Sequence, residues 1–172
     1  MKKIIILASV IVTILSVNKE QVLISPESIR FRVIANSNNK EDQKLKKAVV
    51  NNLKKNIEEL NFNNKNLNQS KTIIKNNIPE FKNTIENTIK TENKSSEYKI
   101  NYGNNYFPEK KYKGITYKEG NYESLVITLG DGLGDNFWCV LFPPLCLIET
   151  EDTNSSEVEY TSIIQEIINK YF

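Results

Sequence analysis

The amino-acid sequence predicts an α+β fold, in which one mixed or antiparallel sheet of about four strands is covered by amphipathic helices. Short segments alternate apolar and polar residues, and longer segments repeat apolar residues every three or four positions. The predicted order is a signal segment, one strand, two helices, three strands, an irregular loop and a final helix. We expect residues 22–172 to form a single extracytoplasmic domain, because about 150 residues are enough to bury one core.

The N-terminus has the pattern of an export signal. Two lysines precede a run of apolar and small residues that extends from Ile4 to Val17. This run is shorter than the roughly 20 residues that a membrane-spanning helix needs. We therefore predict that residues 1–21 are a signal peptide. The alternative is an uncleaved signal anchor that touches the membrane, because Ser16 is the only small residue near the end of the run.

The first strand is predicted where apolar residues alternate with Ser28, Arg30 and Arg32. The apolar face should enter the core, and the arginines should face solvent or contribute to the rim of a contact with a partner. Asn38 is predicted to be the N-cap of a helix that begins near Lys40. The apolar stripe of this helix comprises Leu45, Val49, Leu53, Ile57 and Leu60.

The second helical segment repeats the same spacing up to about residue 91. Pro79 should break or kink it near Asn77, because proline lacks a backbone donor and clashes with the preceding turn. Strands are then predicted at residues 98–102, 112–117 and 122–129, with a hairpin turn at residues 119–121. The last helix spans residues 160–171.

Residues 130–146 combine three glycines with Pro143 and Pro144, which predicts a shaped loop rather than a regular strand or helix. Its large apolar side chains suit either the core or a docking surface. Cys139 and Cys146 suit a disulfide in an exported chain, and the alternative is a pair of buried thiols.

The composition excludes several functional classes. The chain has no histidine, so the common Ser-His-Asp and Cys-His nucleophiles cannot be assembled. The net charge is only +2 and the lysines are scattered, which does not indicate a nucleic-acid partner. We expect no enzyme activity, cofactor or metal. The alternative is a hydrolase that uses carboxylates, for which the candidates are Glu41, Asp42, Asp131 and Asp135. These are more simply read as helix N-terminal charges and turn residues.

Two blocks of the sequence resemble a known family. The segment IRFRVIANSN, from Ile29 to Asn38, is similar to the first signature of the stage II sporulation protein R family. GNYESL, from Gly120, and NFWCVLFPPLC, from Asn136, are similar to its second. The chain has Phe137-Trp138 where the family usually has two tryptophans, Val126 where an arginine is common, and Val50-Asn51 in place of an Arg-Asp pair.

The resemblance implies a protein exported from the forespore into the space between two membranes, where it is secreted or membrane-anchored. Its implied partner is stage II sporulation protein GA, a membrane-embedded aspartic protease that processes the precursor of a sigma factor. We expect the loop to dock on this protease, with Trp138 and Phe142 as anchors. An alternative role is a structural protein of the spore envelope. The candidate partner-binding residues are Arg32, Asn36, Phe137, Trp138, Phe142, Pro143 and Pro144.

Overall fold

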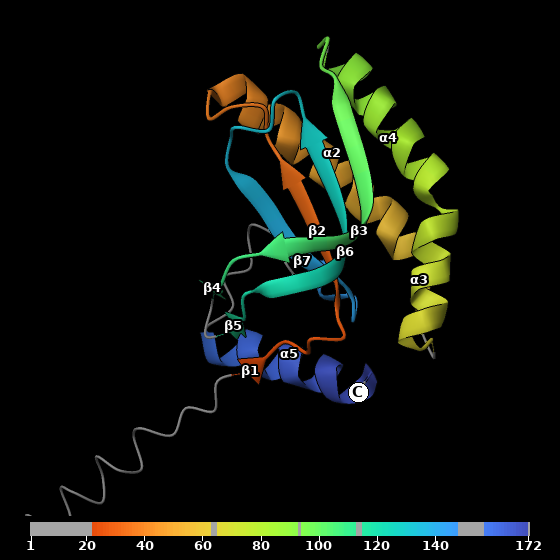
Figure 1. Ribbon diagram of the computed structural model, residues 1–172, viewed down its shortest axis with the longest axis vertical. Coiled ribbons are helices and arrows are strands. Elements are labelled where there is room, and N and C mark those ends of the chain that lie inside the picture. The colour runs from red at the N-terminus through yellow and green to blue at the C-terminus, as the bar shows by residue number, and fades with distance from the viewer. Residues whose placement is uncertain (1–21, 63–64, 93, 113–114, 148–156, 172) are drawn as a thin grey trace, which may run out of the picture.

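The computed structural model describes residues 22–62, 65–92, 94–112, 115–147 and 157–171 (Figure 1). The predicted signal segment, residues 1–21, lies outside these residues. The strands are β1 (Val22–Leu23), β2 (Ile29–Ile34), β3 (Tyr98–Phe107), β4 (Lys110–Tyr112), β5 (Ile115–Tyr117), β6 (Gly120–Leu129) and β7 (Asn136–Phe142). The helices are α2 (Lys40–Glu59), α3 (Leu67–Asn76), α4 (Ile78–Thr91), a 3-10 turn (Leu145–Leu147) and α5 (Glu157–Tyr171).

The main sheet has four strands in the order β3-β6-β2-β7. Strand β2 runs parallel to β6 and antiparallel to β7, and β3 runs antiparallel to β6, so the sheet is mixed. A smaller sheet has the order β1-β5-β4. The predicted α+β class with a mixed sheet of four strands is therefore confirmed.

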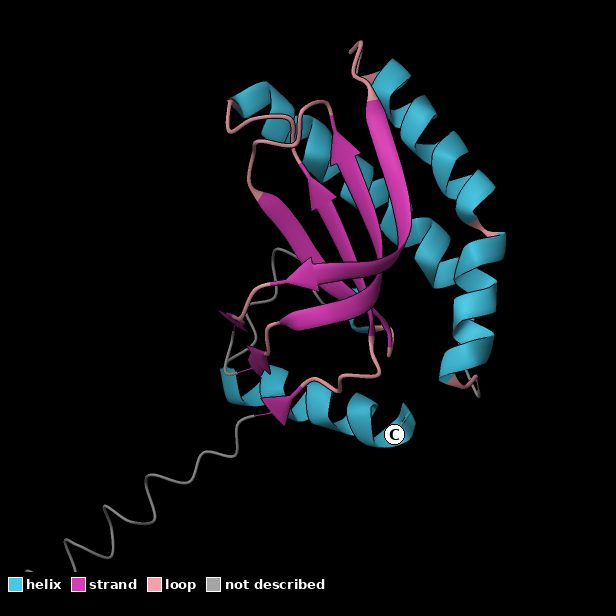
Figure 2. Cartoon of the chain, viewed as in Figure 1, coloured by secondary structure: helices cyan, strands magenta, loops and turns pink. Residues whose placement is uncertain are grey.

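Helices α2, α3 and α4 lie on one side of the main sheet, and α5 lies at its lower end beside β1 (Figure 2). The sheet side of the main core is formed by the apolar residues of β2, as the alternation predicted, since Ile29, Phe31 and Val33 are fully buried. The helix side comprises Leu45, Val49, Leu53, Ile57, Ile74, Phe81, Ile85 and Ile89. Among the described residues, none of the helices has the length and apolar character needed to cross a membrane.

The helix boundaries follow the capping and proline signals, with one shift. Asn39, and not Asn38, caps α2, because the Asn39 side chain accepts a hydrogen bond from the backbone N–H of Asp42 at 2.7 Å. The Asn38 side chain instead accepts from the backbone N–H of Asp135. The predicted break near Asn77 is confirmed: α3 ends at Asn76 and α4 begins at Ile78, with Pro79 in its first turn.

Three predictions about the strands were wrong. Residues 136–142 form strand β7, although we expected an irregular loop there. The predicted single strand at residues 112–117 is replaced by two short strands, β4 ending at Tyr112 and β5 at Ile115–Tyr117, that pair with each other. Residues 119–121 are not a hairpin turn, because β5 and β6 belong to different sheets and β6 pairs with β3 and β2. In each case the strand boundaries depend on pairing with segments distant in the sequence, which the local alternation of apolar and polar residues does not reveal.

Candidate functional site

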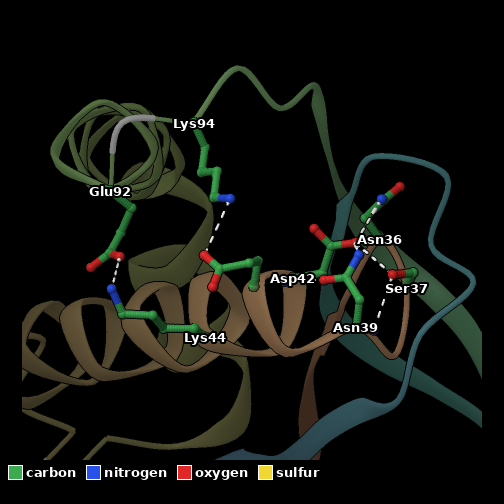
Figure 3. Close-up of polar contacts among 8 residues, drawn as sticks. Asn36, Ser37, Asn39, Asp42, Lys44, Glu92 and Lys94 are labelled. Carbon is green, nitrogen blue, oxygen red and sulfur yellow. Dashed lines mark hydrogen bonds and ion pairs between the residues drawn. The ribbon is translucent and has the colours of Figure 1, made fainter.

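The first part of the site is the turn between β2 and α2, and the Asp42 carboxylate holds it together. One oxygen of this carboxylate accepts hydrogen bonds from Ser37 Oγ at 2.7 Å, Asn36 Nδ2 at 2.8 Å and Asn39 Nδ2 at 3.0 Å (Figure 3). These hydrogen bonds, that of Ser37 foremost, lower the pKa of Asp42 below its usual range. The carboxylate is therefore charged at neutral pH and serves to fix the turn.

The loop between β6 and β7 is fastened to this turn. The backbone N–H of Asp131 donates to Asn36 Oδ1 at 2.9 Å, and that of Leu133 donates to the Asn36 carbonyl at 2.9 Å. The N–H of Gly134 donates to the carbonyl of Ala35, also at 2.9 Å. We call residues 35–39 and 130–135 the loop pair. Its hydrogen bonds join two segments that are far apart in the sequence into one rigid unit.

The loop pair needs glycine at Gly134 and presents one apolar side chain to solvent. A Cβ at Gly134 would overlap the backbone carbonyl of Ser37, so a larger residue would push the two loops apart. Leu133 lies at the tip and is 80% exposed, between the exposed Asp131 and Asp135. Single exposed leucines are ordinary, but this one is held on a fixed backbone.

The second part of the site lies on the side of the sheet opposite the helices. The lower parts of β3 and β6 bend across the end of the main sheet (Figure 1). Phe107 of β3 and Tyr122 of β6 pack against each other and against the Arg30 guanidinium of β2. The Arg30 guanidinium stacks 3.5 Å from the centre of the Tyr122 ring, and its Nη2 donates to the Lys118 carbonyl at 3.5 Å. Arg30 is only 2% exposed, which corrects the expectation that it faces solvent. This burial lowers the pKa of Arg30.

Arg32 and Trp138 are direct neighbours across β2 and β7. The Arg32 guanidinium lies 4.7 Å from the centre of the Phe107 ring, and the Trp138 ring packs edge-on against Phe107 with the ring centres 5.3 Å apart. Lys110 Nζ lies 5.2 Å from the centre of the Trp138 ring. We call Arg30, Arg32, Phe107, Tyr122 and Trp138 the arginine–aromatic face.

The other predicted site residues lie in three places. Asn36 belongs to the loop pair. Phe137 packs against Phe31 on the helix side of the sheet, with the ring centres 6.2 Å apart. Phe142 is 1% exposed and lies in the main core, so its ring forms no part of the surface. Pro143 is buried and Pro144 is half-buried just beyond β7.

Cys139 and Cys146 are joined by a disulfide, as the sequence predicted. Their Cα atoms lie 5.1 Å apart, and both side chains are buried. The bond links β7 to the 3-10 turn that follows it. It therefore fixes the end of the strand that carries Trp138.

The carboxylates proposed for a hydrolase are not assembled into a catalytic group. Asp42 is hydrogen-bonded within its own turn, and Glu41 forms an exposed ion pair with Lys94 at 3.4 Å (Figure 3). Over the described part of the chain, no three His, Cys, Asp or Glu side chains are grouped so that they could hold a metal ion. The contacts that the site does offer suit recognition.

Sequence reasoning identified Arg32, Asn36 and Trp138 as candidates and gave Arg30 an optional place at the rim of a contact, but it missed Phe107 and Tyr122. The signal available for Arg30 was its spacing of two from Arg32 on a strand, which places both on one face. Phe107 and Tyr122 lie on strands distant in the sequence, and no local pattern brings them to β2.

Comparison with known proteins gives a consistent result. The family model of stage II sporulation protein R matches residues 25–152, which include the loop pair and the arginine–aromatic face. The chain is 31% identical over 160 residues to stage II sporulation protein R of Bacillus subtilis (strain 168). That alignment covers 88% of this chain and 71% of the relative. No solved structure matches the chain.

Proposed function

Since this chain belongs to the stage II sporulation protein R family, and so has a role in sporulation, we propose that it is an exported signal that activates a protease. The protease is the membrane-embedded aspartic protease stage II sporulation protein GA, which then processes the precursor of a mother-cell sigma factor. In this proposal the chain itself does no chemistry. It acts by binding the protease and favouring its active state.

Export is the first step of the proposal. Residues 1–21 direct the chain from the forespore into the space between the two membranes, where it is either released or held by an uncleaved anchor. The disulfide between Cys139 and Cys146 supports this location, because such bonds persist outside the reducing cytosol.

The observation that carries the proposal is the preorganised surface formed by the two blocks that resemble the family. Residues 29–38 of the first block meet residues 136–146 of the second through the pairing of β2 with β7. Residues 130–135, which lie between the two parts of the second block, are joined to the first block by the hydrogen bonds of the loop pair. A rigid surface loses little conformational entropy when it binds, which raises affinity. A ligand changes the activity of its partner only if it binds the active state more tightly than the inactive one.

The test is to co-express the chain with the protease and its precursor substrate, and to follow cleavage on immunoblots. Cleavage should depend on the chain. It should persist when Asp131 and Asp135 are changed to Asn, because these carboxylates have no catalytic task in the proposal. Equal amounts of uncut precursor with and without the chain would refute the proposal. Loss of cleavage in the folded Asp→Asn variants would favour the hydrolase instead.

Export is tested separately. Residues 1–30 fused to a reporter that is active only outside the cytoplasm should give a signal. A silent reporter would contradict export, and a shorter mature form on a gel would show cleavage of the segment.

A further inference from the structure

The arginine–aromatic face holds two cations without a carboxylate. Arg30 and Arg32 are the only arginines of the chain, and neither forms an ion pair with any described residue. An arginine cannot shed its charge in a protein, so both remain cationic. Buried arginines are usually paired with anions, and none of the described residues supplies one to this pair.

Two hydrogen-bond donors on this face have no acceptor among the described residues. They are Arg32 Nε and Trp138 Nε1, both buried, and they belong to residues that lie side by side across β2 and β7. Two residues earlier on β2, Arg30 Nε and Nη1 also have no acceptor among the described residues. A buried donor that lacks an acceptor is costly, and an incoming acceptor would remove that cost.

The surroundings of these donors are positive. The pairing of the four strands puts Ile34, Lys99, Asn101, Val126, Thr128 and Asn136 around Arg32 and Trp138 on the same side of the sheet. None of these residues is acidic, and Lys110 adds a cation over the Trp138 ring. No described helix covers this part of the sheet (Figure 2). Arg32 and Trp138 are half-buried, so part of each side chain reaches solvent, whereas Arg30, Phe107 and Tyr122 are buried. The exposed part of the face is therefore complementary to negative charge.

We propose that the arginine–aromatic face is the docking surface for an acidic segment of a partner protein, with an Asp or Glu carboxylate seated on Arg32 and Trp138. The planar guanidinium and the indole N–H match the two oxygens of one carboxylate. The inference rests on the proposed function, which makes the protease the partner. It adds which surface binds and what chemistry the partner must present.

A protein segment fits this face better than a membrane surface does. Anionic lipids are recognised by exposed, flexible cations that reach outward. Arg32 is instead half-buried and stacked on Phe107, so it suits a single carboxylate carried into a shallow site by a peptide chain. The half-buried ring of Trp138, supported by the buried Phe107 ring, would pack against the carbon atoms of that chain.

Trp138 is the only tryptophan, so its fluorescence reports directly on this surface in the purified full-length chain. The probes are acetyl-hexaglutamate, with acetyl-hexaglutamine as its control, and tryptophan-free peptides that tile the extracytoplasmic segments of the protease. We expect hexaglutamate and at least one acidic protease peptide to change the Trp138 emission saturably. Changing Asp and Glu to Asn and Gln in that peptide should abolish the effect.

The matched variants are Arg32→Gln and Lys82→Gln, which each remove one positive charge. Lys82 is exposed on α4, on the opposite side of the sheet. Arg32→Gln should weaken peptide binding at least about 30-fold, as expected when one partner of a desolvated charge pair is lost. Lys82→Gln should bind like the wild-type chain. Both variants should keep the wild-type circular dichroism spectrum, which confirms that they are folded.

The outcomes separate this inference from the proposed function. If the wild-type chain triggers cleavage in cells and folded Arg32→Gln does so equally well, the docking surface is wrong and the proposed function stands. If the wild-type chain triggers no cleavage but hexaglutamate binds and Arg32→Gln does not, the proposed function is wrong and the acidic site stands. If the Trp138 emission changes only with phosphatidylglycerol vesicles, or only when the chain self-associates, the proposal that an acidic protein segment binds this face is wrong.

Discussion

Truncating Trp138 and Phe142 in turn tests whether the surface and the core of β7 have been assigned correctly. Phe142 is 1% exposed and packs edge-on against Phe62 and Tyr171, with ring centres 6.1 and 5.3 Å away. A fully buried phenylalanine changed to alanine costs about 3–5 kcal/mol of unfolding free energy. Its two ring contacts favour the upper part of that range, about 4–5 kcal/mol.

Trp138 should cost less, because it is half-buried and, among the described residues, packs against one aromatic ring, that of Phe107. Taking about half of the buried-aromatic value gives about 2 kcal/mol. In a domain of this size each kcal/mol shifts the melting temperature by about 2–4 °C. Trp138→Ala should therefore melt about 4–8 °C lower than the wild-type chain, and Phe142→Ala about 8–20 °C lower.

The assay combines thermal melting by circular dichroism with precursor cleavage, corrected for the amount of folded exported chain. Trp138→Ala should fail to trigger cleavage although most of the variant is folded. Phe142→Ala should trigger less cleavage only because less of it is folded, so its cleavage per folded molecule should equal that of the wild-type chain. The reasoning fails if the two variants melt at the same temperature. It also fails if folded Trp138→Ala triggers cleavage as well as the wild-type chain does.

Three further changes test the loop pair and the disulfide. Gly134→Ala should cost about 1–3 kcal/mol of stability through overlap with the Ser37 carbonyl, and a wild-type urea midpoint would contradict this. Asp42→Asn should destabilise the chain at pH 7. Because hydrogen bonds lower the pKa of Asp42 in the folded state, its stabilisation is full above the unfolded pKa of about 3.9 and is lost as the pH falls below that value. The urea midpoints of variant and wild type should thus converge near pH 2–3, and a constant difference would oppose the argument. Reducing the bond between Cys139 and Cys146, seven positions apart, should lower stability by about 2–3 kcal/mol in chemical denaturation, and an unchanged midpoint would show that the bond contributes nothing.

The parts of the fold that the sequence predicted depend on local patterns. The alternation from Ile29 to Val33 and the apolar stripe of α2 show which residues face the core, because burial of one face imposes the period. Pro79 placed the boundary between α3 and α4 for an equally local reason, the missing backbone donor. The small sheet and the strand order were not predictable, because they depend on partners far along the chain.

Strand β7 was missed because both of its faces are apolar. Phe137, Cys139 and Leu141 face the main core, while Trp138 and Val140 pack on the other side. No polar residue marks the alternation, so the segment reads as a continuous apolar run. The glycines lie before the strand and the prolines directly after it, so neither interrupts its interior.

The candidate site was predicted in its residues but not in its arrangement. Arg32, Asn36 and Trp138 stood out by residue type and resemblance, and they lie on β2 and β7 or beside them. Phe107 and Tyr122 reach the same place only because β3 and β6 pair and bend across the end of the main sheet. Which side chains surround an arginine is therefore a property of the sheet register.

The burial of Arg30 is hard to explain by stability alone. Its stacking on Tyr122 contributes about 2 kcal/mol in a desolvated setting. Its Nε and Nη1 have no acceptors among the described residues, and each such donor costs about 1–3 kcal/mol. Together the two donors cost about 2–6 kcal/mol, which equals or exceeds the gain from stacking, so an apolar residue of similar volume would serve the fold at least as well. A cation held two residues from Arg32, on the same side of β2, does, however, strengthen the positive potential around Arg32 and Trp138, which is what an acidic partner would require.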